Sequence, residues 1–110
     1  MPLQLVDAGF DVWMGNNRGT KYSAENTQYT DKTSEEYWNW SWGEMGTIDA
    51  PAFIDRIIQI TSQPQVTYIG YDQGNTQIFY GLTQDKTLAS KINKVIALAP
   101  CVFYNSKTMP

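Results

Sequence analysis

Histidine is absent from this 110-residue chain. Most hydrolytic triads use histidine as the general base, because its pKa of about 6.5 lets it take up and return a proton. No imidazole of this polypeptide can therefore activate a nucleophile or bind a metal ion, and we expect neither a transition-metal site nor a cofactor. The single cysteine, Cys101, excludes a disulfide within the chain and leaves the redox compartment undecided.

Basic patches and long apolar runs are missing as well. The chain carries 8 basic and 11 acidic residues, a net charge of -3, and this balance argues against nucleic acid as a partner. No apolar run approaches the roughly 18 residues that a membrane span requires. The first residues, MPLQLVD, lack the charged start and the apolar core of a signal peptide, so nothing in the sequence selects a compartment.

The residues that are present predict one small α/β unit over residues 1–110. Hydrophobic residues make up 42% of the chain, which is enough for a buried core. Turn-rich residues 16–34 are expected to form a long loop. The alternation of strands and helices favours a parallel sheet with flanking helices. The expected elements are a helix over 3–8, a strand over 10–14, a short helix capped by Ser41 and Glu44, a helix over 51–60, a strand over 66–71, helices over 75–84 and 88–91, and a strand over 95–99, whose continuous apolar run predicts burial on both faces.

The stretch YIGYDQGNTQIFYGL, residues 68–82, has the form of a strand, a sharp turn and a helix. Gly70 and Gly74 flank Asp72 at the turn. Serine hydrolases carry G-x-S-x-G at such a nucleophile elbow, where a strained turn presents the nucleophile at the top of a strand. Here the central residue is aspartate, so the pattern predicts the elbow backbone without its serine.

Five segments, taken in order, resemble the acid lipase family, which includes the lysosomal and gastric lipases and steryl ester hydrolases. They are DAGFDVWMGNNRG (7–19), YWNWSWGEM (37–45), DAPAFID (49–55), YIGYDQGNTQ (68–77) and ALAP (97–100). The resemblance implies an α/β-hydrolase fold, of which this chain would be the part from about strand 4 to strand 6. It also implies an ancestral hydrolysis of neutral-lipid esters, with the backbone N–H of Gln73 as one donor of the oxyanion hole.

Two departures from that pattern predict a catalytically inert chain. Asp72 replaces the elbow serine, and the triad histidine is missing from the whole sequence. Loss of one triad member costs about 10⁴-fold in rate. The second oxyanion donor, the triad acid and the histidine would all lie outside residues 1–110 in the family's arrangement.

The resemblance also implies a gap in the sheet. In this fold the third strand lies between the fourth, here residues 10–14, and the fifth, here residues 66–71. Unpaired buried backbone groups cost about 1–3 kcal/mol each. We therefore expect the chain either to borrow a strand from a protein partner or to be part of a longer hydrolase.

Several interpretations of Asp72 stay open at this stage. It could be a replaced nucleophile whose carboxylate is stabilised at a helix N-terminus. It could be a covalent nucleophile, as in the epoxide hydrolases and haloalkane dehalogenases, within a longer chain. The match could also be an ordinary strand–turn–helix, or the serine could have been exchanged by error or by engineering. A non-catalytic pseudohydrolase subunit that docks on a partner through strand edges is the alternative function.

Other candidate residues are expected to be structural. Gly15 to Lys21 lacks the spacing of a phosphate loop. Arg18 is expected to bond loop carbonyls or a carboxylate, and Asp49 to cap a helix. The aromatic residues Tyr37, Trp38, Trp40 and Trp42 are expected to pack between the loop and the core.

Overall fold

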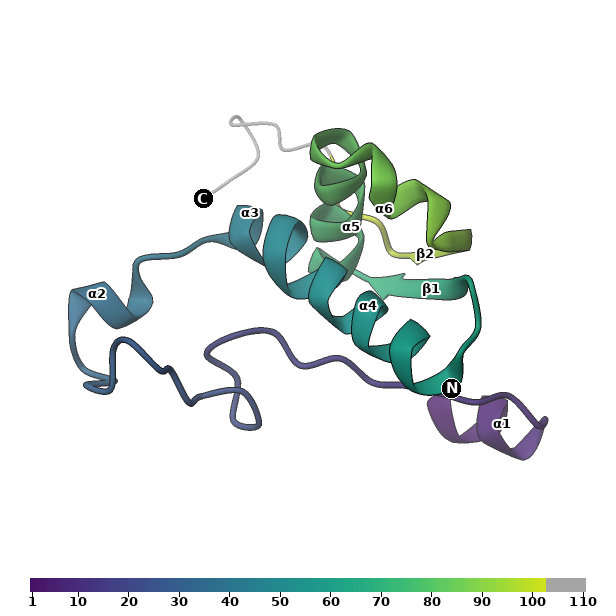
Figure 1. Cartoon of the computed structure of the whole chain (residues 1–110), viewed down its shortest axis with the longest axis horizontal. Helices are drawn as coiled ribbons and strands as arrows, with labels where there is room; N and C mark the ends of the chain where they lie inside the picture. The colour runs from purple at the N-terminus through teal and green to yellow at the C-terminus, as the bar shows by residue number, and fades with distance from the viewer. Residues whose placement is uncertain (103–110) are drawn as a thin grey trace.

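The computed structural model describes residues 1–102 (Figure 1). Its elements are α1 (Pro2–Asp7), α2 (Glu35–Trp38), α3 (Trp42–Glu44), a π-helical turn η1 (Met45–Asp49), α4 (Ala50–Thr61), β1 (Val66–Tyr71), α5 (Gln73–Gln84), α6 (Lys86–Ser90) and β2 (Ile92–Leu98). Within this part of the chain no helix is both long and apolar enough to cross a bilayer.

The two strands form a parallel pair, which confirms the α/β class. Gly70 lies opposite Ala97, and Tyr71 lies opposite Leu98. Helices α5 and α6 provide the crossover that a parallel pair requires. β1 has the bounds that the sequence predicts, whereas β2 begins three residues earlier than predicted, at Ile92.

The predicted strand over residues 10–14 is wrong. That segment is irregular, and Phe10, Trp13 and Met14 are exposed. A strand is stabilised by ladder hydrogen bonds to a neighbour, and the sheet in the described residues has only the order β1–β2. The segment has the composition of a strand but no neighbour with which to pair. By contrast, the helix predicted over residues 3–8 is present as α1.

The buried core lies between three helices and one face of the sheet. Ala50 and Ile54 of α4, Ile78 of α5 and Leu88 of α6 are its fully enclosed members. Val66, Tyr68, Ile92 and Val95 pack against them from the strands. Figure 1 shows α4, α5 and α6 gathered around β1 and β2, while α2 and the loop before it project away. The core thus lies between these helices and the sheet face that carries Val66 and Tyr68.

The prediction that the last strand is buried on both faces is also wrong for the described residues. Ile96 of β2 and Tyr71 of β1 are exposed. The three helices of the core cover only the face that carries Val66 and Tyr68. The apolar run in β2 is therefore covered on one face and open to solvent on the other.

Local signals at the helix ends account for where the helices begin. Ser41 and Glu44 form the predicted capping box, in which the Glu44 carboxylate accepts hydrogen bonds from the backbone N–H and the hydroxyl of Ser41. Pro51 is the second residue of α4 and follows directly on the π-helical turn, from which the helical backbone continues into α4. The helix ends at Ser62, which has a left-handed backbone with φ 57°.

Candidate functional site

The turn between β1 and α5 has the backbone of a strained elbow. Asp72 has φ 47° and ψ -115°, a combination that a residue with a Cβ seldom adopts. Its N–H donates to the carbonyl of Leu98 (3.1 Å), and its carbonyl accepts from the N–H of Asn75 (3.0 Å). The Asp72 side chain is exposed and makes no capping hydrogen bond with α5. The carboxylate therefore stands free at the carboxyl end of the sheet.

Gly70 is required because Asn75 fills the space above it. A Cβ at Gly70 would overlap Oδ1 of Asn75. Asn75 is fully buried, and its Nδ2 donates to the carbonyl of Leu98 (2.8 Å). That single carbonyl thus accepts bonds from both the elbow backbone and the first turn of α5. Sequence reasoning missed Asn75, since an asparagine in a first helical turn is no specific signal.

Gln73 and Gly74 differ from Gly70 in how the fold constrains them. Gln73 is the first residue of α5 and is exposed, so its backbone N–H belongs to the helix end that has no intrahelical acceptor. A Cβ at Gly74 would meet only the hydroxyl of Tyr68, at 3.8 Å. Within residues 1–102, packing therefore requires glycine at Gly70 but not at Gly74.

The strained backbone at Asp72 predicts that glycine at this position would stabilise the fold. Glycine adopts positive φ without the steric cost, which is about 1–3 kcal/mol for such an outlier, although it adds backbone entropy to the unfolded chain. Asp72→Gly is therefore expected to raise the free energy of unfolding by about 1 kcal/mol in urea denaturation. The change Asp55→Gly, in the helical backbone of α4, is expected to lower it by about 1–2 kcal/mol, because it also removes the ion pair between Asp55 and Lys91. A lower stability for Asp72→Gly would mean that the elbow is not strained.

A second polar site lies where the loop meets α4. Both Nε (2.9 Å) and Nη2 (2.7 Å) of Arg18 donate to Oδ1 of Asp49, and the backbone N–H of Arg18 donates to Oδ2 (3.0 Å). Of the two kinds of partner that the sequence predicts for Arg18, loop carbonyls or a carboxylate, the structure shows the carboxylate. The prediction that Asp49 caps a helix is wrong, because its side chain makes no cap hydrogen bond with α4 and is 8% exposed. The π-helical turn ends at Asp49, before α4 begins.

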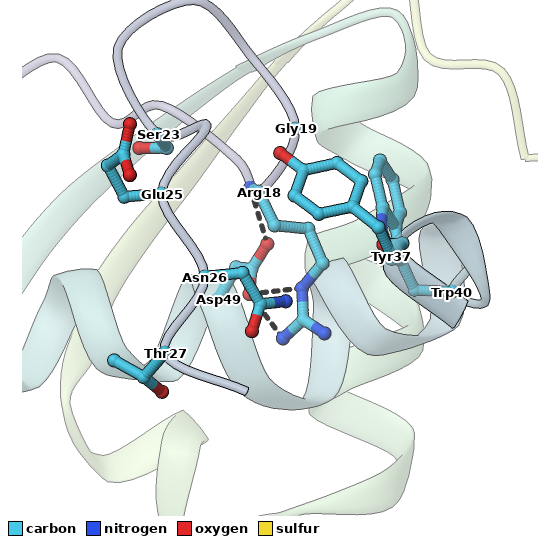
Figure 2. Close-up of a pocket in the computed structure, with 9 residues that line it drawn as sticks. All are labelled: Arg18, Gly19, Ser23, Glu25, Asn26, Thr27, Tyr37, Trp40 and Asp49. Atoms are coloured by element: carbon cyan, nitrogen blue, oxygen red, sulfur yellow. Dashed lines mark hydrogen bonds and ion pairs between the residues drawn. The ribbon is translucent and has the colours of Figure 1, made fainter. Parts of the chain in front are cut away.

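An open pocket lies beside this ion pair (Figure 2). Its volume is about 310 Å³. Its lining is mostly polar, and the side chains of Tyr37 and Trp40 stand on one side of the Arg18 guanidinium. Tyr37 is buried, and its hydroxyl donates to the carbonyl of Ala24 (2.8 Å). The aromatic residues therefore pack the loop against the body of the chain in part, although Trp38 and Trp42 stay half exposed.

Few groups with a possible catalytic role lie at the elbow in residues 1–102. They are the carboxylate of Asp72 and the backbone N–H groups at the start of α5, which have no acceptor within the helix. No histidine exists in the sequence to serve as base. In the described part of the chain no group of three or more acidic, cysteine or histidine side chains could hold a metal ion.

A family model for the alpha/beta hydrolase fold matches residues 2–110. The chain belongs to the α/β-hydrolase fold family. Its relatives are acid lipases, and mouse gastric triacylglycerol lipase is 45% identical over 96 residues, which is 87% of this chain and 24% of that protein. The lysosomal acid lipase/cholesteryl ester hydrolase of Macaca fascicularis is 42% identical over 106 residues, 96% of this chain and 26% of that protein. A probable lipase of Schizosaccharomyces pombe is 44% identical over 98 residues, 89% and 21% of the two chains.

These relatives confirm the resemblance to acid lipases over nearly the whole chain. The chain spans about a quarter of the length of the relatives that it matches. That quarter contains the elbow turn, the loop with Arg18 and the two parallel strands.

Proposed function

We propose that this chain is the nucleophile-elbow segment of an acid-lipase-type hydrolase domain and that it does not hydrolyse neutral-lipid esters. The observation that carries the proposal is the replacement at the elbow. Asp72 has the strained backbone of a nucleophile, but its side chain is a carboxylate. The names of the relatives, gastric triacylglycerol lipase and lysosomal acid lipase/cholesteryl ester hydrolase, support neutral-lipid esters as the ancestral substrates.

The chemistry of a carboxylate explains the expected inertness. Attack by Asp72 on an ester carbonyl would form a mixed anhydride and expel an alkoxide that no histidine of this chain can protonate. The carboxylate lies next to the N-terminus of α5, and helix N-termini in general favour a negative charge. Stabilising the free anion lowers the drive to form a covalent bond, so the attack on the ester carbonyl is disfavoured.

Isotope labelling separates this proposal from a covalent aspartate nucleophile. In that mechanism an alkyl group is transferred to the carboxylate, and water then attacks the side-chain carbonyl carbon of Asp72. Turnover in H₂¹⁸O would therefore add ¹⁸O to the tryptic peptide of residues 57–86. We expect no ¹⁸O in that peptide after incubation with alkyl esters or epoxides. Incorporation that Asp72→Asn abolishes would overturn the proposal.

A second function, docking on a protein partner, is favoured by the open edge of β1. In the described residues β1 pairs only with β2, so one row of its backbone N–H and C=O groups has no ladder partner. An exposed edge is a template for strand addition by another chain. Native mass spectrometry of the protein from its source tests this function. A stable complex with a different protein would support it, and a single chain with no partner would contradict it.

A further inference from the structure

Three side chains and one backbone carbonyl form a hydrogen-bonded chain beneath the elbow. Nδ2 of Asn17 donates to Oε1 of Gln77 (2.8 Å), and Nε2 of Gln77 lies 3.2 Å from the hydroxyl oxygen of Tyr68. The Tyr68 hydroxyl donates to the carbonyl of Gly74 (3.0 Å), the second residue of α5. Met45 lies beside the first residue of this hydrogen-bonded series, with Sδ 3.4 Å from Nδ2 of Asn17. The series links the long loop, α5, β1 and the elbow.

The bonds all run in one direction. An amide nitrogen can only donate and an amide oxygen can only accept, so the Asn17 donor fixes which end of the Gln77 amide faces Tyr68. With the Gln77 nitrogen facing Tyr68, the hydroxyl accepts there and keeps its own proton for Gly74. Burial raises the pKa of Tyr68 above its ordinary value of 10.0, an effect that the bond from Gln77 partly offsets, so the hydroxyl retains that proton at neutral pH.

Because Gln77 is buried, the direction of these hydrogen bonds affects the residues on both sides of it. Gln77 is 5% exposed, so water does not easily replace a lost partner of its amide. An unsatisfied buried amide is costly, and the group instead rotates or moves to find another partner. A change at Asn17 is therefore passed to Gln77, then to Tyr68 and then to Gly74, although Asn17 and Gly74 make no direct hydrogen bond.

We infer that Asn17, Gln77 and Tyr68 are positioning residues that hold the Gln73–Gly74 backbone of the elbow, so that the loop beginning at Asn17 controls the shape of the anion-facing turn. The inference rests on the proposed function only in taking this turn to be the nucleophile elbow. Asn17, a loop residue far from Asp72 in sequence, thus has a defined effect on the N–H groups that follow Asp72. Neither the sequence pattern nor the relatives' names point to that connection.

Asn17→Asp is the most specific variant, because it keeps the shape of the side chain and removes its N–H donor. The Gln77 amide is then expected to turn its nitrogen toward Asp at position 17 and its oxygen toward Tyr68. Tyr68 would donate to that oxygen and release the carbonyl of Gly74. If Asn17 only filled space, Asn17→Asp would leave the elbow unchanged. If Asn17 acts through its N–H donor, the same change reverses the direction of the hydrogen bonds.

Amide hydrogen exchange of the complete gene product, followed by mass spectrometry, tests the inference. Asn17→Asp and Asn17→Ala are expected to speed exchange in the peptide covering residues 70–78 by about five- to tenfold, with residues 92–98 unchanged. Asn26→Ala is the matched loop control, because among residues 1–102 the Asn26 side chain bonds only the nearby N–H groups of Gln28 and Tyr29. It is expected to leave both peptides unchanged.

The double variant Asn17→Ala/Tyr68→Phe adds a second criterion. Once Tyr68 has lost its hydroxyl, the change at Asn17 is expected to have no further effect on the elbow peptide. The inference is wrong if the Asn17 variants leave the elbow peptide unchanged, if both peptides speed up together, or if the two changes are additive. Ester hydrolysis is not part of this measurement, so the inference can fail while the proposed function stands.

Discussion

Ile78→Ala is expected to lower the free energy of unfolding by about 3–5 kcal/mol, a large share of the stability of a domain of this size. Ile78 has no exposed surface and lies in α5 against the sheet. Its neighbours in the core are Ala50, Ile54 and Leu88, which come from two other helices. Truncation leaves a cavity between these helices, since none of them can move inward without losing its contacts with the strands.

Ile48→Ala is the matched control for this core prediction. Ile48 is 53% exposed in the π-helical turn, so the same atoms are removed without opening a cavity. We expect a change of about 0.5 kcal/mol or less in urea unfolding. Equal losses for Ile48→Ala and Ile78→Ala would contradict the place of Ile78 in the buried core.

Gly81→Ala is expected to destabilise the fold by about 2–3 kcal/mol, against the gain that alanine usually brings to a helix. A Cβ at Gly81 would overlap the backbone oxygen of Gly46, and a Cβ at Gly46 would overlap the backbone oxygen of Gln77. Helix α5 and the π-helical turn therefore touch through their backbones. Because no side-chain rotation can relieve that contact, the added methyl group would push the two elements apart.

Gly74→Ala, in the same helix, is the control for the close approach. Its Cβ would lie 3.8 Å from the Tyr68 hydroxyl oxygen, an ordinary contact. This change is expected to be neutral or to stabilise by up to about 1 kcal/mol. The comparison is made by thermal or urea unfolding of the two variants. A loss for Gly74→Ala as large as that for Gly81→Ala would contradict the backbone contact.

The elements that local signals define could be predicted from the sequence. Strand residues 66–71, the helix after Asp72 and the capping box at Ser41 all depend on neighbours close in the chain. The strand predicted over residues 10–14 is absent for the opposite reason. Their apolar pattern is that of a strand, but a strand also needs a partner at a distance, and none is present in the described residues.

The polar contacts of the site could be predicted only in part. The sequence predicts loop carbonyls or a carboxylate as the partner of Arg18. It does not single out Asp49, because the two residues meet only after the loop folds onto the π-helical turn. The chain from Asn17 through Gln77 to Tyr68 was not expected at all. Its members lie up to 60 residues apart, and asparagine and glutamine have no distinctive spacing when they act in this way.

Steady-state hydrolysis of an emulsified neutral-lipid ester by the purified complete gene product tests the central claim most directly. We predict no turnover above that of an Asp72→Asn variant, because the elbow presents a carboxylate where ester hydrolysis requires an activated hydroxyl. Catalytic hydrolysis that Asp72→Asn abolishes would contradict the account and make Asp72 a working nucleophile.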